Sequence, residues 1–161
     1  QIFSQLLSFG YLWAEIRVKG GAYGCGFNCG LTGNMSFTSY RDPNPLNSLA
    51  VYTKAGDFLT EFCQSKETVD KYVISSVSNM DGLKSSAAKG RMADMLYLRD
   101  SGFDELRELR HEMLAVTKDD IANSASLLAK LATKGSQVII GNAEALAEKL
   151  DDPEWEVWKL S

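Results

Sequence analysis

The stretch Arg17-Val-Lys-Gly-Gly-Ala-Tyr-Gly24 decides the fold, because a helical pattern ends in it and a strand pattern begins. Apolar residues before it recur at helical spacing, and two adjacent glycines then supply a stop. After it, apolar and small residues alternate with a period of two, which is typical of a strand. We therefore predict a helix-to-strand junction that carries a cation, Arg17, and a phenol, Tyr23.

The first predicted helix covers residues 2–16. The apolar residues that recur in it at helical spacing are Phe3, Leu6, Leu7, Leu12, Trp13 and Ile16. Gly10 weakens this helix by about 1 kcal/mol relative to alanine. Arg17 and Lys19 follow at its C-terminal end, where the helix dipole favours cations.

Two strands follow the junction. In residues 23–31, the apolar series Tyr23, Cys25, Phe27, Cys29 and Leu31 alternates with the series Gly24, Gly26, Asn28 and Gly30. One face of this strand is therefore expected to be apolar and the other nearly bare. A turn at residues 32–34 leads to a second strand from Met35 to Arg41, which the prolines of Asp42-Pro43-Asn44-Pro45 end.

The rest of the chain is mainly helical in pattern. Helices are predicted over residues 46–62, 66–80, 85–98, 102–114, 118–131 and 143–150, with Thr117 as an N-cap, and a short strand over Gln137–Ile140. The expected buried residues of the first are Leu49, Tyr52, Phe58, Leu59 and Phe62. One face of the second carries Val69, Tyr72, Val73, Val77 and Met80. Trp155 and Trp158 are expected to pack on the body.

These patterns predict one α+β domain over residues 1–161, with a small, antiparallel-rich sheet covered on one face by helices. Three strands are few for so many helices, and the chain opens with Gln instead of Met. We therefore expect a piece of a longer polypeptide, with further strands supplied upstream of Gln1.

Composition narrows the possible functions. The chain has 161 residues, of which 45% are hydrophobic and 24% charged, as in ordinary globular proteins. Its net charge of −4 disfavours nucleic-acid binding, and no apolar run approaches the roughly 20 residues that span a membrane. The cysteines Cys25, Cys29 and Cys63 form no C-x-x-C pair, so we expect reduced thiols rather than disulfides or a zinc knuckle.

The single histidine, His111, argues against a metal site in this chain. Metallopeptidase motifs of the H-E-x-x-H or H-x-x-E-H type need two histidines on one helix face, and Ala115 occupies the place of the second. The segment Gly24-Cys-Gly26-Phe-Asn-Cys29 follows a helix and lacks the third glycine of a dinucleotide-binding loop. We predict neither a metal nor a nucleotide here.

The remaining candidate is the bare strand face beside Arg17 and Tyr23. An extended peptide could approach Gly24 and Gly26 closely, because no side chains stand in its path. Tyr23 could donate to an oxyanion, and Arg17 could hold a substrate through several N–H donors. The residues alone leave a second interpretation open, in which Arg17 only caps the helix and Tyr23 only packs.

Several blocks of the sequence resemble a known family. These are Leu12-Trp-x-x-Ile16-Arg17-x-Lys19-Gly-Gly-Ala-Tyr23-Gly24, Ser39-Tyr-Arg-Asp-Pro43-Asn44, Arg110-x-x-x-Leu114-Ala-Val-Thr117 and Val138-Ile-Ile-Gly141-Asn142. Together they resemble the C-terminal domain of the presequence-protease branch of the insulinase-like (pitrilysin, M16) zinc peptidases. The first block is specific, whereas the last two are weak on their own.

The resemblance implies a LuxS/MPP-like metallohydrolase fold within a large enzyme that degrades unfolded peptides. Zinc and its H-x-x-E-H motif would belong to N-terminal domains of the same polypeptide. Tyr23 would act near the scissile carbonyl, Arg17 would hold the substrate backbone, and Arg41 would be a third substrate contact. The compartment implied is a bacterial cytoplasm or an organellar matrix.

Two alternatives remain from other functional classes. The chain could be a noncatalytic structural or interaction domain of the same fold, or a free-standing peptide-binding domain. The joint presence of Arg17 and Tyr23 in one compact motif favours the enzyme.

Overall fold

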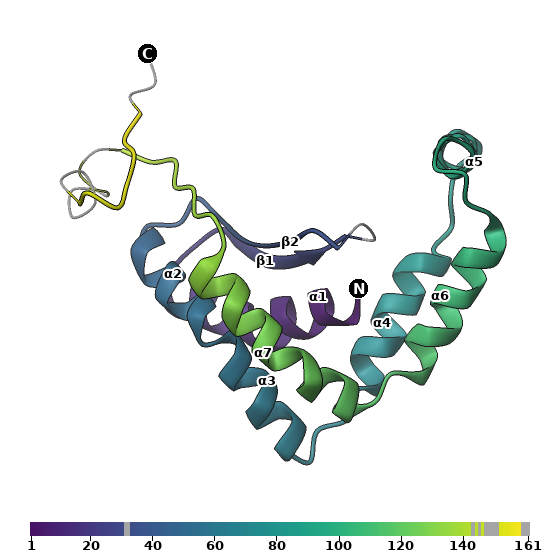
Figure 1. The fold of residues 1–161 in the computed structure, drawn as a ribbon, viewed down its shortest axis with the longest axis horizontal. Helices are drawn as coiled ribbons and strands as arrows, with labels where there is room; N and C mark the ends of the chain where they lie inside the picture. The colour runs from purple at the N-terminus through teal and green to yellow at the C-terminus, as the bar shows by residue number, and fades with distance from the viewer. Residues whose placement is uncertain (31–32, 143, 145, 147–151, 159–161) are drawn as a thin grey trace.

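The computed structural model describes residues 1–30, 33–142, 144, 146 and 152–158 (Figure 1). The elements in this part are α1 (Ile2–Leu7), η1 (Ser8–Lys19), β1 (Gly24–Cys29), β2 (Met35–Tyr40), α2 (Pro45–Thr53), α3 (Ala55–Gln64), α4 (Asp70–Asp81), α5 (Ser86–Leu98), α6 (Phe103–Ala115) and α7 (Lys118–Lys134). The predicted α+β class is confirmed.

The sheet is formed by β1 and β2, which pair antiparallel with Phe27 opposite Phe37. Opposite residues of an antiparallel pair share a face, so the two phenylalanines lie together, with ring centres 4.8 Å apart. Phe37 in turn stacks on Tyr52 of α2, and this face is the buried one. The other face carries the glycines of β1 and the exposed side chains of Ser36, Thr38 and Tyr40. The predicted apolar and bare faces are therefore present over β1, but Tyr23, which was predicted in the apolar series, is 66% exposed and meets the Tyr40 ring. Leu31 lies outside the described residues.

The first helix begins as α1 and continues as η1, a π-helix of 12 residues. π-Helices are usually single-turn bulges, so one of this length is unusual. Its wider turn is visible at the end, where the Gly20 N–H donates to the Glu15 carbonyl five residues back (3.1 Å). Gly21 then has a φ of +81°, a conformation that glycine adopts without strain. The predicted helix and glycine stop are confirmed, but the π-helical winding was not foreseen.

Gly10 lies at a close approach between helices. A Cβ at this position would be 2.7 Å from the Tyr72 hydroxyl and 3.3 Å from the Phe58 ring. α3 and α4 therefore pack against η1 through the space that Gly10 leaves. The predicted weak point of the helix is thus a packing position.

The prediction of one continuous helix over residues 46–62 is wrong. The segment forms two helices, α2 and α3, which are separated at Lys54. The Lys54 N–H bonds the Val51 carbonyl three residues back (3.1 Å), so the α-helical ladder is interrupted there. α3 packs mainly on α7, whereas α2 contacts η1, β2 and α7. Tyr52 of α2 lies under the sheet, whereas Gly56 of α3 lies against α7.

The buried residues form one cluster that includes α1, η1, β1, α2, α3, α4, α6 and α7. α3 and α7 run side by side, as do α4 and α6, and α5 lies at the far end of the molecule (Figure 1). None of the α5 residues is buried.

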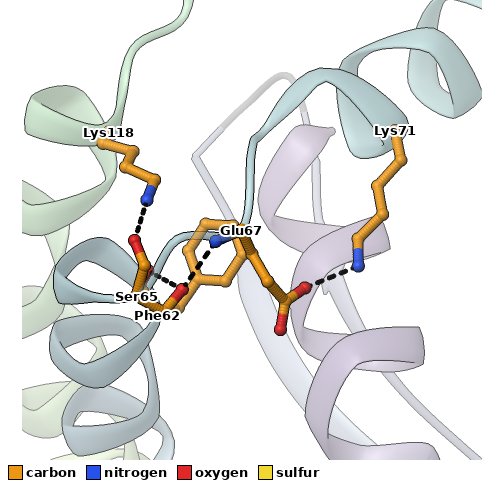
Figure 2. Close-up of polar contacts among 5 residues, drawn as sticks. All are labelled: Phe62, Ser65, Glu67, Lys71 and Lys118. Carbon is orange, nitrogen blue, oxygen red and sulfur yellow. Dashed lines mark hydrogen bonds and ion pairs between the residues drawn. The ribbon is translucent and has the colours of Figure 1, made fainter.

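A polar network joins the end of α3 to the start of α7 (Figure 2). The Lys118 ammonium donates to the Ser65 carbonyl (2.6 Å) and lies 5.6 Å from the centre of the Phe62 ring. The Ser65 hydroxyl donates to the Phe62 carbonyl and accepts from the Glu67 N–H. These contacts cap the C-terminal end of α3 and hold the connection to α4 against α7.

Two predictions for the C-terminal part are wrong. Gln137–Ile140 has no strand structure, and Val138 and Ile140 are 83% and 82% exposed. A strand needs a neighbour for its backbone hydrogen bonds, and the described part of the sheet contains only β1 and β2. Trp158 does not pack on the body either, since it is 78% exposed. The predicted helix over residues 143–150 lies largely outside the described residues.

Candidate functional site

The helix-to-strand junction places Tyr23 at the end of the sheet. The preceding residue, Ala22, is buried, and its N–H donates to the Ile16 carbonyl (3.1 Å), which ties the junction to η1. The Tyr23 N–H donates to the carbonyls of both Tyr40 (3.1 Å) and Arg41 (3.3 Å). Hydrogen bonds to η1, through Ala22, and to the end of β2, through Tyr23 itself, therefore fix the backbone at this point.

The Tyr23 side chain points to the surface, with 66% of its area exposed. Its ring meets the Tyr40 ring edge to face, with centres 6.0 Å apart and an interplanar angle of 81°. The Arg41 guanidinium lies 5.9 Å from the centre of the Tyr23 ring and 5.5 Å from that of Tyr40. We call Tyr23, Tyr40 and Arg41 the tyrosine–arginine cluster.

Arg17 has a different aromatic partner. Its guanidinium lies 3.9 Å from the centre of the Trp13 ring, one turn back on η1, in cation–π geometry. Burial raises the pKa of the nearby Cys25 thiol, and the Arg17 backbone and charge partly oppose this increase. Arg17 thus lies near Cys25 of β1, at the same end of the sheet as Tyr23.

Arg41 has a φ of +46°, in the left-handed region that few non-glycine residues occupy. The turn after it is held by side chains. The Asp42 carboxylate accepts from the Asn44 N–H (2.9 Å) and from the Ser48 hydroxyl (2.5 Å). The Asn44 amide donates to the Gly20 carbonyl (3.0 Å), which joins this turn to the glycines of the helix-to-strand junction.

The two strand glycines have different surroundings. A Cβ on Gly24 would meet nothing within 4 Å, whereas one on Gly26 would lie 3.4 Å from the Ser8 hydroxyl. That hydroxyl also accepts the Phe27 N–H (2.9 Å), so η1 already covers the edge of β1 at this point. The open surface is therefore at Gly24, beside Tyr23 and Tyr40, and a peptide pairing farther along β1 would displace Ser8.

Sequence reasoning missed Tyr40 as a neighbour of Tyr23. The block Ser39-Tyr-Arg-Asp-Pro43-Asn44 indicated that this segment belongs to the site, but it did not show which of its side chains would face the helix-to-strand junction. The pairing of Gly24 with Tyr40 across the strands is what brings the two tyrosines together.

The described residues do not fit a metal ion, because no three His, Cys, Asp or Glu side chains among them gather closely enough to hold one. His111 is exposed on α6. Within the same part of the chain, no helix is both long and apolar enough to cross a bilayer.

Comparisons with known proteins identify relatives along almost the whole chain. The sequence profile of the PreP C-terminal domain matches residues 1–144. Protein HypA of Clostridium perfringens is 31% identical over 150 residues, which are 93% of this chain and 15% of HypA. Presequence protease 1, chloroplastic/mitochondrial, of Arabidopsis thaliana is 33% identical over 145 residues, 89% of this chain and 13% of that protein. The mitochondrial presequence protease of Schizosaccharomyces pombe is 38% identical over 123 residues, 75% of this chain and 12% of that protein. The chain thus spans about a seventh of the length of these relatives.

Proposed function

The chain belongs to the PreP C-terminal domain family, and on that premise we propose that it is the substrate-binding C-terminal domain of a zinc-dependent endopeptidase that degrades unfolded peptides. Residues 1–161 form one domain of LuxS/MPP-like fold in this proposal, and its partners are the peptide substrate and the N-terminal domains of the same polypeptide. The function implies a bacterial cytoplasm or an organellar matrix.

The observation that carries this proposal is the exposure of the Tyr23 phenol beside open space at Gly24. A tyrosine that only packed would turn its ring into the core, as Tyr52 and Tyr72 do at 8% exposure. Arg17 lies at the same end of the sheet, and Arg41 lies over the Tyr23 ring. An extended peptide that crossed Gly24 would therefore lie beside the Tyr23 phenol, with Arg17 at the same end of the sheet.

Each of these groups has a defined role in the proposal. The Tyr23 hydroxyl donates a hydrogen bond to the oxygen of the scissile carbonyl as negative charge develops on it. Arg17 donates to a substrate carbonyl, and Gly24 lets the peptide backbone approach the strand. Zinc chemistry would have to come from groups outside the described residues, since these do not fit the metal. The 161-residue chain alone is therefore expected to be inactive.

The test is the Tyr23→Phe variant of the complete protease polypeptide that contains this domain. Loss of one oxyanion donor typically lowers turnover by about 10² to 10³, so we expect kcat to fall by this amount with little change in KM. Tyr97→Phe is the matched control, because Tyr97 is an exposed tyrosine on α5. An unchanged kcat in Tyr23→Phe would remove Tyr23 from the reaction.

A specific observation also favours a second candidate, a noncatalytic interaction domain. At the connection between α5 and α6, Tyr97, Leu98 and Phe103 expose between 65% and 85% of their areas. Exposed apolar side chains that gather in one region often mark contacts with other proteins or domains. Normal peptide turnover with Tyr23→Phe and Arg17→Ala combined would favour this second function over the first.

A further inference from the structure

We propose that Tyr40 and Arg41 are positioning residues, which hold the Tyr23 phenol in the orientation that its reaction requires. This inference rests on the function proposed above for Tyr23. It adds Tyr40 to the residues of the site and gives Arg41 an action through Tyr23 instead of a direct contact with substrate.

The rings of Tyr23 and Tyr40 are not held by the core, since 66% and 59% of their areas are exposed. An exposed tyrosine side chain ordinarily samples several rotamers. In the tyrosine–arginine cluster, the edge of one ring meets the face of the other, and the Arg41 guanidinium lies within 6 Å of both ring centres. Edge-to-face and cation–π contacts of this geometry are attractive and directional, so they restrict the Tyr23 ring.

The backbone brings the three residues together independently of their side chains. The Tyr23 N–H is shared between the carbonyls of Tyr40 and Arg41, which lie in the next strand and at its end. Arg41 takes up a left-handed φ of +46° at this point. A non-glycine residue in that region is uncommon, and such residues are enriched where function requires a particular geometry.

The turn that follows keeps Arg41 in this place. Asp42 accepts hydrogen bonds from Asn44 and Ser48, and Asn44 donates to Gly20 of the helix-to-strand junction. The segment with Tyr40 and Arg41 is thus tied to the segment with Tyr23 by side chains as well as by the strand pair. A rigid support of this kind is what an oriented donor needs.

Gly24 leaves the cluster accessible. It pairs with Tyr40 across the sheet, and a Cβ on it would meet nothing within 4 Å. A peptide can therefore reach the Tyr23 hydroxyl over Gly24 without displacing Tyr40 or Arg41. The arrangement separates the surface that substrate crosses from the groups that orient the phenol.

The kinetic test uses Tyr40→Leu and Arg41→Ala in the complete protease polypeptide. Misorientation of a catalytic group commonly costs one to two powers of ten in rate, so we expect kcat to fall about 10-fold or more with KM nearly constant. Tyr40→Phe keeps the ring and Arg41→Lys keeps the charge, and both should restore kcat relative to the first pair. In a Tyr23→Phe background, Tyr40→Leu should cause no further loss, because the group that it positions is already absent.

A structural readout on the 161-residue chain is independent of activity. The ring-proton resonances of Tyr23, assigned by their loss in Tyr23→Phe, should be displaced from random-coil positions by the Tyr40 ring current. Tyr40→Leu should return them toward those positions, and the control Tyr97→Leu should not. Circular dichroism confirms that each variant is folded before it is compared.

The outcomes separate this inference from the function on which it rests. If Tyr23→Phe lowers kcat but Tyr40→Leu and Arg41→Ala do not, only the positioning role is overturned. A raised KM at constant kcat in Arg41→Ala would instead make Arg41 a direct substrate contact. Random-coil Tyr23 resonances in the unaltered chain would overturn the cluster itself, whereas a normal kcat in Tyr23→Phe would overturn the proposed function.

Discussion

Arg17 and Tyr23 are close in sequence, yet each has its own aromatic neighbour. Arg17 stacks on Trp13 of η1, and Tyr23 meets Tyr40 of β2. Stacking leaves the N–H donors at the rim of the guanidinium available, because only its face contacts the ring. A planar cation with this support loses little freedom when it binds a peptide carbonyl.

Arg17→Ala is therefore expected to weaken peptide binding. A hydrogen bond from a charged group contributes about 1.5–3 kcal/mol, which corresponds to a rise in KM of roughly 10-fold to 150-fold, with a smaller effect on kcat. Steady-state kinetics of the complete polypeptide measure this. Lys19→Ala is the control, since Lys19 is an exposed cation paired with Glu15 on the same helix. Equal KM values for the two variants would reduce Arg17 to a helix cap.

Tyr11 predicts a pH dependence at alkaline pH. Burial, followed by the nearby carboxylates of Glu15, Asp57 and Glu61, raises its pKa from 10.0 to about 12. The neutral phenol also donates to the Val51 carbonyl (3.0 Å) and stacks on Phe58. Because the folded-state pKa lies above the unfolded one, this stabilisation is complete below pH 10 and is lost as the pH rises toward 12.

The measurement is the free energy of unfolding as a function of pH, in the unaltered chain and in Tyr11→Phe. The variant should be less stable at neutral pH, because it lacks the hydrogen bond to Val51. Its stability should fall less steeply between pH 10 and 12, because it lacks the group that titrates there. Identical slopes in this range would show that Tyr11 does not contribute to the alkaline transition.

At the scale of elements, the contact between α3 and α7 depends on small residues. A Cβ on Gly56 would lie 2.9 Å from the Ala125 carbonyl and 3.3 Å from the Ala129 methyl group. The two helix backbones therefore approach closely at this point. Local pattern could predict both helices but not this contact, since Gly56 reads only as a weak helix former.

Gly56→Ala is expected to destabilise the chain by about 1–3 kcal/mol, because the helices must move apart to admit the methyl group. Gly90→Ala provides the opposite control. Gly90 lies inside α5, and a Cβ on it would meet nothing within 4 Å, so the substitution should stabilise by about 0.5–1 kcal/mol through helix propensity alone. Urea unfolding compares the two. A stabilising Gly56→Ala would show that the α3–α7 contact is looser than described.

The observed bounds of the helices and strands show which of them the sequence pattern could predict. The positions of β1, β2, the glycine stop and the helices from α4 to α7 were predicted within a few residues, because each has a clear period and a turn or cap beside it. The division at Lys54 and the π-helical winding of η1 were not predictable in this way. The break at Lys54 and the π-helical winding leave the spacing of apolar residues almost unchanged, so the sequence pattern does not reveal them. Each occurs in a helix that packs against more than one element.

At the scale of the whole molecule, burial is uneven. α3 and α7 contribute Leu59, Phe62, Ile121 and Leu128 to the core, whereas α5 contributes no buried residue. Figure 1 shows α5 at the opposite end of the molecule from α2. Local opening requires least free energy where few apolar contacts are lost.

Hydrogen exchange should follow this difference. We expect the amides of α5 to exchange fastest among the described helices and those of α3 and α7 to exchange slowest. Mass spectrometry of peptic fragments after short deuterium labelling measures both in one sample. Protection of α5 equal to that of α7 in the isolated chain would contradict this, and would indicate that α5 is covered, for example by a second copy of the chain.

The sequence by itself determined the α+β class, the helix-to-strand junction and the presence of Arg17, Tyr23 and Gly24 within it, because these follow from local periodicity and residue type. Only the tertiary structure decided that Tyr23 meets Tyr40 and Arg41, that Ser8 covers β1 at Phe27, and that Gln137–Ile140 is not a strand. The physical reason is distance along the chain. Strand register, an occupied sheet edge and a missing strand neighbour depend on residues far apart in sequence, and no local pattern encodes them.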